Sequence, residues 1–210
     1  MKIPFLFLCF ALLGFASNAQ ESVDAAAIEP KAQFQLNVND TFYLLNEKEL
    51  LKVTETLVKP TISIQLADFK KFNSNYVSFE YPRQYTFEFN EDAGINYKNW
   101  IFSGNDIKVM LFQFGSTVSI DALIDGMVSK FGKRNCKVTP FKKKLGIKVC
   151  EGRSLRVSMA EQLLNMDFYE LSSNGEGTII MAFQSSLEDD GSSSGEYKTG
   201  FKTIDNSISY

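Results

Sequence analysis

The chain has 210 residues, of which 44% are hydrophobic and 22% are charged, and its formal net charge is −3. This length and apolar fraction predict one globular domain with its own core and exclude a disordered chain. The sequence contains no histidine, so it lacks the commonest general base and the commonest metal ligand. We therefore expect a non-catalytic protein with no cofactor and no metal site.

Residues 1–19 have the features of a secretory signal peptide. A lysine gives the positive start, an apolar run extends from Ile3 to Phe15, and Ser17-Asn18-Ala19 forms a small-residue cleavage site. The apolar run is too short for a comfortable membrane span. We expect a mature protein that is secreted or periplasmic, has no transmembrane segment and begins with a flexible leader over 20–32.

Two local patterns stand out in the N-terminal extension, residues 33–75. Alternating apolar residues predict a β-hairpin over 34–45 that turns at Asn39-Asp40. A helix is predicted to begin at Asn46, because Asn46 and Glu49 have the spacing of a capping box.

The rest of the single domain, residues 76–210, alternates strands with two helices. Ser119 is a good N-cap for a helix that Gly132 ends, and apolar spacing from Tyr197 to Ile208 predicts a closing helix. Alternation or short apolar runs predict strands over 77–81, 85–89, 97–102, 107–114, 137–141, 147–157, 163–171 and 178–184. The expected fold class is α+β, an antiparallel sheet with helices packed on its faces.

This order of elements resembles the PsbP-like superfamily, which includes photosystem II extrinsic proteins and Ran-binding import factors. The residues that carry the resemblance are Tyr76-Val77-Ser78-Phe79-Glu80-Tyr81-Pro82, the helix at 119–131, the strands from Gly146 to Gly152, the strand at 179–183 and the closing Ile204-Asp205-Asn206-Ser207-Ile208. The resemblance covers roughly 75–208 and implies an α/β/α sandwich that acts as a binding or assembly module. It supplies no shared functional residues.

Removal of the signal peptide leaves Cys136 and Cys150 as the two cysteines of the chain. In an oxidising compartment an even number of cysteines favours a disulfide, here across a β-hairpin, which would contribute roughly 3 kcal/mol. The alternative is a redox pair, but exchange-active cysteines are usually separated by two residues. We therefore expect a structural Cys136–Cys150 bridge.

Between Lys130 and Arg156 the chain has ten basic residues and one acid, so this segment carries +9. Lysines at the tip of a hairpin would present a positive surface to a protein or an anionic envelope component, including a peripheral membrane contact. The predicted binding residues are Lys137, Lys142, Lys143, Lys144, Lys148, Arg153 and Arg156. The alternative is a solvated edge strand whose lysines discourage aggregation. Nucleic acid is not expected, because the chain is acidic and lacks aromatic residues interleaved with these charges.

Other functions remain open alternatives. A carrier of a small apolar ligand or lipid would use a pocket beneath the closing helix. An envelope hydrolase without histidine would need a Ser-Lys pair, and Ser129-Lys130 does not have the usual spacing. Glu188-Asp189-Asp190 offers oxygen ligands for Ca²⁺, but an acidic surface loop is the better interpretation because the spacing is not that of an EF-hand.

Overall fold

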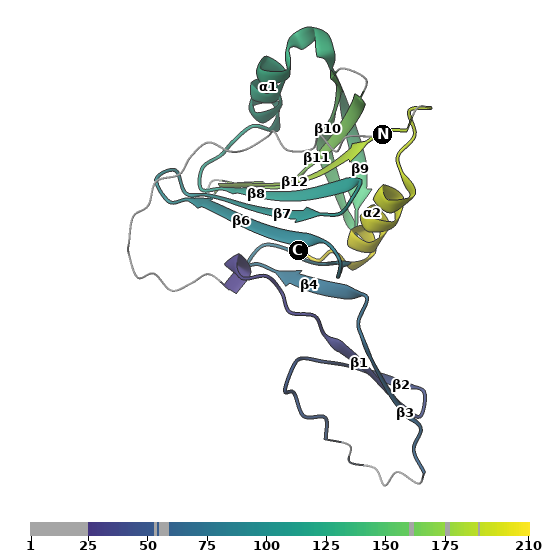
Figure 1. Ribbon diagram of the computed structural model, residues 1–210. Helices are drawn as coiled ribbons and strands as arrows, with labels where there is room; N and C mark the ends of the chain where they lie inside the picture. Colours follow the sequence, from purple (N-terminus) through teal and green to yellow (C-terminus); the bar gives the residue numbers. More distant parts are fainter. Residues whose placement is uncertain (1–24, 53, 55–58, 160–161, 175–176, 189) are drawn as a thin grey trace.

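The computed structural model describes residues 25–52, 54, 59–159, 162–174, 177–188 and 190–210. Within them the chain forms twelve β-strands, two α-helices and two short 3₁₀ turns. Figure 1 shows a large twisted sheet with a helix near each end and a small sheet that projects below it. The predicted signal peptide lies outside the described residues.

Seven antiparallel strands form the main sheet, in the order β6-β7-β8-β12-β11-β10-β9. They are β6 (Thr86–Asp92), β7 (Tyr97–Ser103), β8 (Ile107–Phe114), β9 (Cys136–Leu145), β10 (Lys148–Met159), β11 (Gln162–Asn174) and β12 (Gly177–Ser186). Because β8 pairs with β12, the sheet consists of two meanders that meet in its interior. The edge strands are therefore β6 and β9.

Two smaller sheets precede the main sheet. The first has the order β2-β1-β3 and contains β1 (Phe34–Val38), β2 (Thr41–Leu45) and β3 (Ile62–Leu66). In the second, β4 (Phe69–Asn73) pairs with β5 (Ser78–Pro82). The described residues of the extension therefore add no strand to the main sheet.

Both predicted α-helices are present, and each begins after a serine cap. The Ser119 hydroxyl accepts from the Asp121 N–H at 3.2 Å before α1 (Ile120–Phe131), and Gly132 ends this helix at φ 86°. The Ser194 hydroxyl accepts from the Tyr197 N–H at 3.1 Å before α2 (Gly195–Ser207). The sequence predictions of the two helices are thus confirmed.

The main sheet separates two apolar cores. The first core packs side chains of β4, β5 and α2 on one face, including Phe72, Phe79 and Ile204. The second core packs Ile120 and Ile124 of α1 on the other face. Residues adjacent along β7 and β8 alternate between the two cores, as expected for a sheet covered on both faces.

The expected α+β class, with helices packed on the faces of an α/β/α sandwich, is wrong, because the protein is mostly β. Much of the first core is closed by the β4–β5 ribbon: the Phe72 ring lies 5.2 Å from the Phe102 ring and 5.7 Å from Trp100. Strand β4 was not expected, although Phe69 and Phe72 supply part of its apolar content. A ribbon of strands thus covers, together with α2, this face of the main sheet.

Of the two elements predicted in the extension, the hairpin forms and the helix does not form over its described first residues. The predicted hairpin over 34–45 is confirmed, with positive φ angles of 49° at Asn39 and 65° at Asp40 in its turn. Asn46 also makes its capping contact, since its N–H donates to Glu49 Oε2 at 2.8 Å. Residues 46–52 are nevertheless not helical, and most of the remaining predicted helix lies outside the described residues.

Part of the predicted leader, residues 20–32, packs against the domain. Ala25–Ala27 form a short 3₁₀ turn, and the Ala26 carbonyl accepts from Trp100 Nε1 at 2.7 Å. Lys70 Nζ forms an ion pair with Glu29 at 2.5 Å. These contacts hold the start of the described chain against the first core.

The predicted disulfide is wrong, because Cys136 and Cys150 are both free. In the β9–β10 register Cys136 lies opposite Val157, whereas Cys150 lies opposite Lys143. The two cysteines are therefore seven strand positions apart, or roughly 24 Å at about 3.4 Å per residue. They also belong to different cores, since Cys150 is buried in the first and Cys136 packs against the second.

Candidate binding surfaces

The predicted basic site lies on the β9–β10 hairpin, but its lysines are not at the tip. The turn is formed by Gly146 and Ile147, and Ile147 is 91% exposed. Lys142, Lys143 and Lys144 are residues of strand β9. The prediction of a lysine-bearing tip is wrong, because β9 continues to Leu145 before the chain turns.

The alternation of a strand divides the predicted site between two faces of the hairpin. Lys137, Lys143 and Arg156 share the face of Cys150, which belongs to the first core. Lys137 and Arg156 lie directly opposite each other in the register. Two like charges in such a pair repel each other, so this pair is favourable only with an anion nearby or in full contact with water.

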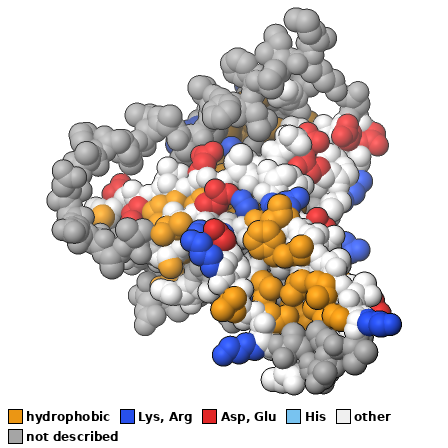
Figure 2. All heavy atoms as spheres, turned by 60° about the horizontal axis from the view of Figure 1, so that its bottom comes forward, with side chains coloured by type: hydrophobic (Ala, Val, Ile, Leu, Met, Phe, Trp, Pro, Cys, Tyr) orange, Lys and Arg blue, Asp and Glu red, His pale blue; other side chains and the backbone are white. Residues whose placement is uncertain are grey.

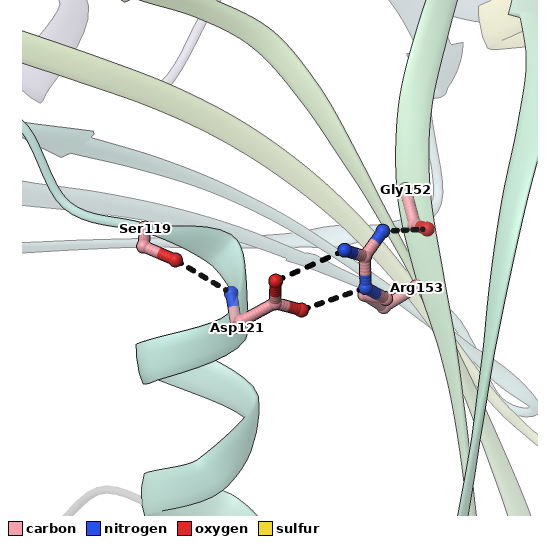
Figure 3. A network of polar contacts seen from close by, with 4 residues as sticks. All are labelled: Ser119, Asp121, Gly152 and Arg153. Carbon is pink, nitrogen blue, oxygen red and sulfur yellow. Dashed lines mark hydrogen bonds and ion pairs between the residues drawn. The ribbon is translucent and has the colours of Figure 1, made fainter.

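Lys142, Lys144 and Arg153 lie on the other face, where two of the three are neutralised. Lys142 Nζ lies 3.4 Å from Glu151 Oε1. Arg153 makes a bidentate pair with Asp121 of α1, with Nε–Oδ1 at 2.7 Å and Nη2–Oδ2 at 3.0 Å (Figure 3). Arg153 also donates to the Gly152 carbonyl at 3.0 Å, so its guanidinium joins the hairpin to the first turn of α1.

Lys148 and Lys143 are held by neighbouring groups. Lys148 Nζ donates to the Leu171 carbonyl and lies 5.2 Å from the centre of the Tyr210 ring. Lys143 Nζ lies 4.6 Å from the centre of the Phe141 ring. The predicted residues therefore form no single patch, and β9 carries its lysines and Pro140 along an open edge, as the edge-protection alternative expects.

A second candidate surface was not predicted: the apolar face of the β2-β1-β3 sheet. The side chains of this face come from alternate positions in register, and they are Phe34, Leu36, Val38, Thr41, Tyr43, Leu45, Ile62, Ile64 and Leu66. On β3 the exposed fractions are 59% for Ile62, 63% for Ile64 and 46% for Leu66. The exposure of the face is concentrated on this strand, because Val38 is buried and the other apolar side chains of β1 and β2 on this face are half-buried. Figure 2 shows hydrophobic side chains gathered at this end of the molecule.

This apolar face differs from the edges of the main sheet in its charge. None of the residues in β1, β2 and β3 is charged. The main-sheet edges carry acids on β6 and lysines on β9. The signal that could have found β3 is the alternation of Ile62-Ser63-Ile64-Gln65-Leu66, which has the period of a strand.

The space beneath α2, where a carrier would hold its ligand, is packed with aromatic rings. Phe201 of α2 lies 4.9 Å from Phe183 and 6.3 Å from Tyr169, measured between ring centres. Beside these rings, Asn165 Nδ2 donates to Asp167 Oδ1 at 3.0 Å, and burial together with the Asp167 charge raises the pKa of Tyr197.

A hollow of about 360 Å³ lies elsewhere and is lined by Lys148, Val149, Glu151, Glu170, Leu171 and Ser172. Its charged lining does not suit an apolar ligand.

Two further features bear on metals and membranes. Across the described ranges, no group of three His, Cys, Asp or Glu side chains is placed to hold a metal ion. Asp189 of the acidic loop lies outside these ranges. In the same part of the chain, no helix combines the length and apolar character that a bilayer crossing needs.

No known protein family matches the chain, and no curated protein does. The solved structures that are similar to part of it include the following two. A protein from Bacteroides thetaiotaomicron VPI-5482 is 15% identical at a TM-score of 0.37, over 68% of this chain and 48% of that one. LpqN, involved in cell envelope biogenesis of Mycobacterium tuberculosis, is 13% identical at a TM-score of 0.35, over 63% of this chain and 82% of that one.

This chain thus spans about half the length of the first of these structures. Neither structure is described as PsbP-like, and the resemblance to that superfamily stays a prediction.

Proposed function

We propose that the protein is an exported, non-catalytic binding module that docks a protein partner on the apolar face of its β2-β1-β3 sheet. The observation that carries this proposal is the exposure of Ile62, Ile64 and Leu66 on one uncharged strand. A contiguous exposed apolar patch is typical of an interaction site, whereas single exposed apolar residues are not. The signal peptide predicted over 1–19 supports export.

The energetics of the face favour a partner. Covering an isoleucine or leucine that is about half exposed contributes on the order of 1 kcal/mol, so these three side chains together contribute on the order of 3 kcal/mol. A three-stranded sheet needs packing on its apolar face for stability of its own. The sheet projects from the body in Figure 1, and no helix of the described chain lies on it.

The test is capture of partners by the full mature protein from its own envelope fraction. We expect Ile64→Lys to abolish capture, because it places a charge in the middle of the exposed edge strand of the apolar face. The matched control is Gln65→Lys, which puts the same charge on the opposite face of the same strand and should capture normally. Equal capture by both variants would refute docking on this face.

A second contact, with an anionic envelope component, is favoured by one specific observation. Lys137 and Arg156 lie opposite each other on the hairpin, and neither makes an ion pair with another described residue. A partner held by this pair would be lost at high salt, since exposed charges are screened over about 8 Å at physiological ionic strength. A partner held by the uncharged apolar face would be retained. Capture at both salt concentrations therefore separates the two surfaces.

A further inference from the structure

Among the described residues, no strand pairs with the outer edge of β3, which presents a row of backbone groups. We infer that this edge pairs with the β3 edge of a second copy of the chain, antiparallel and across a two-fold axis at Ile64. The inference rests on the proposed function in one respect: the resulting dimer presents the apolar face at double width to the docked partner.

The backbone of β3 shows which residues face the open edge. The Asn39 N–H donates to the Thr61 carbonyl at 3.0 Å, and the Ala67 N–H donates to the Gln33 carbonyl at 2.8 Å. Successive residues of a strand direct their backbone groups to opposite sides, so the odd-numbered positions bond to β1. Ile62, Ile64 and Leu66 therefore direct their N–H and C=O groups outward.

The sequence of β3 is complementary to itself in this arrangement. With the two-fold axis at Ile64, Ile62 of one copy lies opposite Leu66 of the other, and Ser63 lies opposite Gln65. Each pair matches an apolar with an apolar or a polar with a polar side chain, as an isologous interface requires. The outward groups of the two strands would form about six backbone hydrogen bonds.

The area of the sheet favours an added strand over face-to-face stacking. Three strands about 4.8 Å apart, with five residues each at about 3.4 Å, have a footprint of about 250 Å². This is well below the ~800 Å² per partner of a stable protein interface, so neither stacking nor edge pairing of this small sheet is expected to form a tight dimer. Edge pairing adds backbone hydrogen bonds and extends one apolar face to about 500 Å².

The contrast with the edges of the main sheet favours β3 as a pairing edge. Natural proteins block edge-to-edge pairing with charges and proline, and β9 has both in its lysines and Pro140. The edge strand β6 has Glu88 and Glu91. Strand β3 has neither charge nor proline, and all five of its residues are exposed. Strand β2, the other open edge of the small sheet, also lacks both, but its Tyr43 and Leu45 are half-buried.

The test is sedimentation of the purified mature protein over a wide concentration range. We expect a monomer at low concentration and a dimer at high concentration, because the interface is small. Ile64→Pro should abolish the dimer, since it removes an outward N–H at the two-fold axis without breaking a bond to β1. The matched control is Leu44→Pro, which removes an outward N–H from the other open edge, β2, and should leave the dimer intact.

Several results would overturn the inference. They are a wild-type protein that stays monomeric at high concentration, a dimer that survives Ile64→Pro, and a dimer that is lost with Leu44→Pro. If Ile64→Pro does not fold, the double variant Ser63→Cys with Gln65→Cys keeps the inference testable. These positions lie opposite each other between copies and should form intermolecular disulfides on oxidation, and no cross-linking would refute the pairing. Sedimentation and cross-linking use the purified protein without a partner. A negative result in them therefore refutes the dimer alone, whereas a negative capture experiment refutes the proposed docking.

Discussion

The bidentate pair between Arg153 and Asp121 gives the sharpest test of whether a predicted binding residue is a structural one. Replacing Arg153 with methionine removes the charge and keeps most of the apolar stem. If the guanidinium fixes α1 on the hairpin, this substitution destabilises the fold. If it serves a partner instead, the stability of the isolated protein does not change.

The magnitude follows from the geometry. Both N–O distances are at most 3.0 Å, and the side chains are 23% exposed for Arg153 and 58% for Asp121. Exposed pairs contribute about 0.2–1 kcal/mol, and the bidentate geometry places this one near the upper end, at about 1 kcal/mol. For a chain of this length, a loss of about 1 kcal/mol lowers Tm by about 2–4 °C.

The assay is a double-mutant cycle of Arg153→Met and Asp121→Asn, with unfolding free energies from urea denaturation. The cycle is needed because Asp121 also stabilises the first turn of α1 through the helix dipole. Lys144→Met is the matched control: Lys144 lies on the same face of the hairpin and makes no ion pair with a described residue. A coupling energy below about 0.3 kcal/mol, within the usual additivity error, would refute the structural role.

Three further predictions concern the cores and the cysteines. A reducing agent should leave Tm unchanged, because Cys136 and Cys150 are not bridged; a lower Tm would contradict the free thiols. Phe72→Ala should lower the free energy of unfolding, measured by urea denaturation, by about 3–5 kcal/mol, since this fully buried ring joins β4 to the first core. A decrease below about 1 kcal/mol would contradict the packing of the β4–β5 ribbon in this core. Burial raises the pKa of Tyr97 from 10.0 to about 12, so its stabilising contribution is complete below pH 10 and is lost as pH rises toward 12. Tyr97→Phe should reduce this loss of stability at alkaline pH. If the variant's free energy of unfolding depends on pH as that of the wild type does, the role of Tyr97 is refuted.

Turn residues and helix caps were sufficient to predict an element wherever one or two residues determine the local backbone conformation. Asn39-Asp40 tolerates positive φ angles and therefore specifies the first hairpin. Ser119 satisfies a backbone donor of α1, and Gly132 permits the φ of 86° at its end. The helix predicted from Asn46 shows the limit: its capping contact forms, but Leu50 is 87% exposed and no apolar face is buried over 46–52. A cap stabilises a helix that packing supports, and it does not replace the packing.

The sequence by itself determined the strands of the main sheet and both helices, because periodicity and caps act within a few residues. Only the tertiary structure decided how the hairpin at 136–159 pairs, and a register that places Cys136 opposite Val157 excluded the disulfide and divided the basic residues between two faces. Only the tertiary structure, too, left Ile62, Ile64 and Leu66 exposed. An apolar alternation specifies a face to be buried, but what covers it depends on segments far away in the chain or on another molecule.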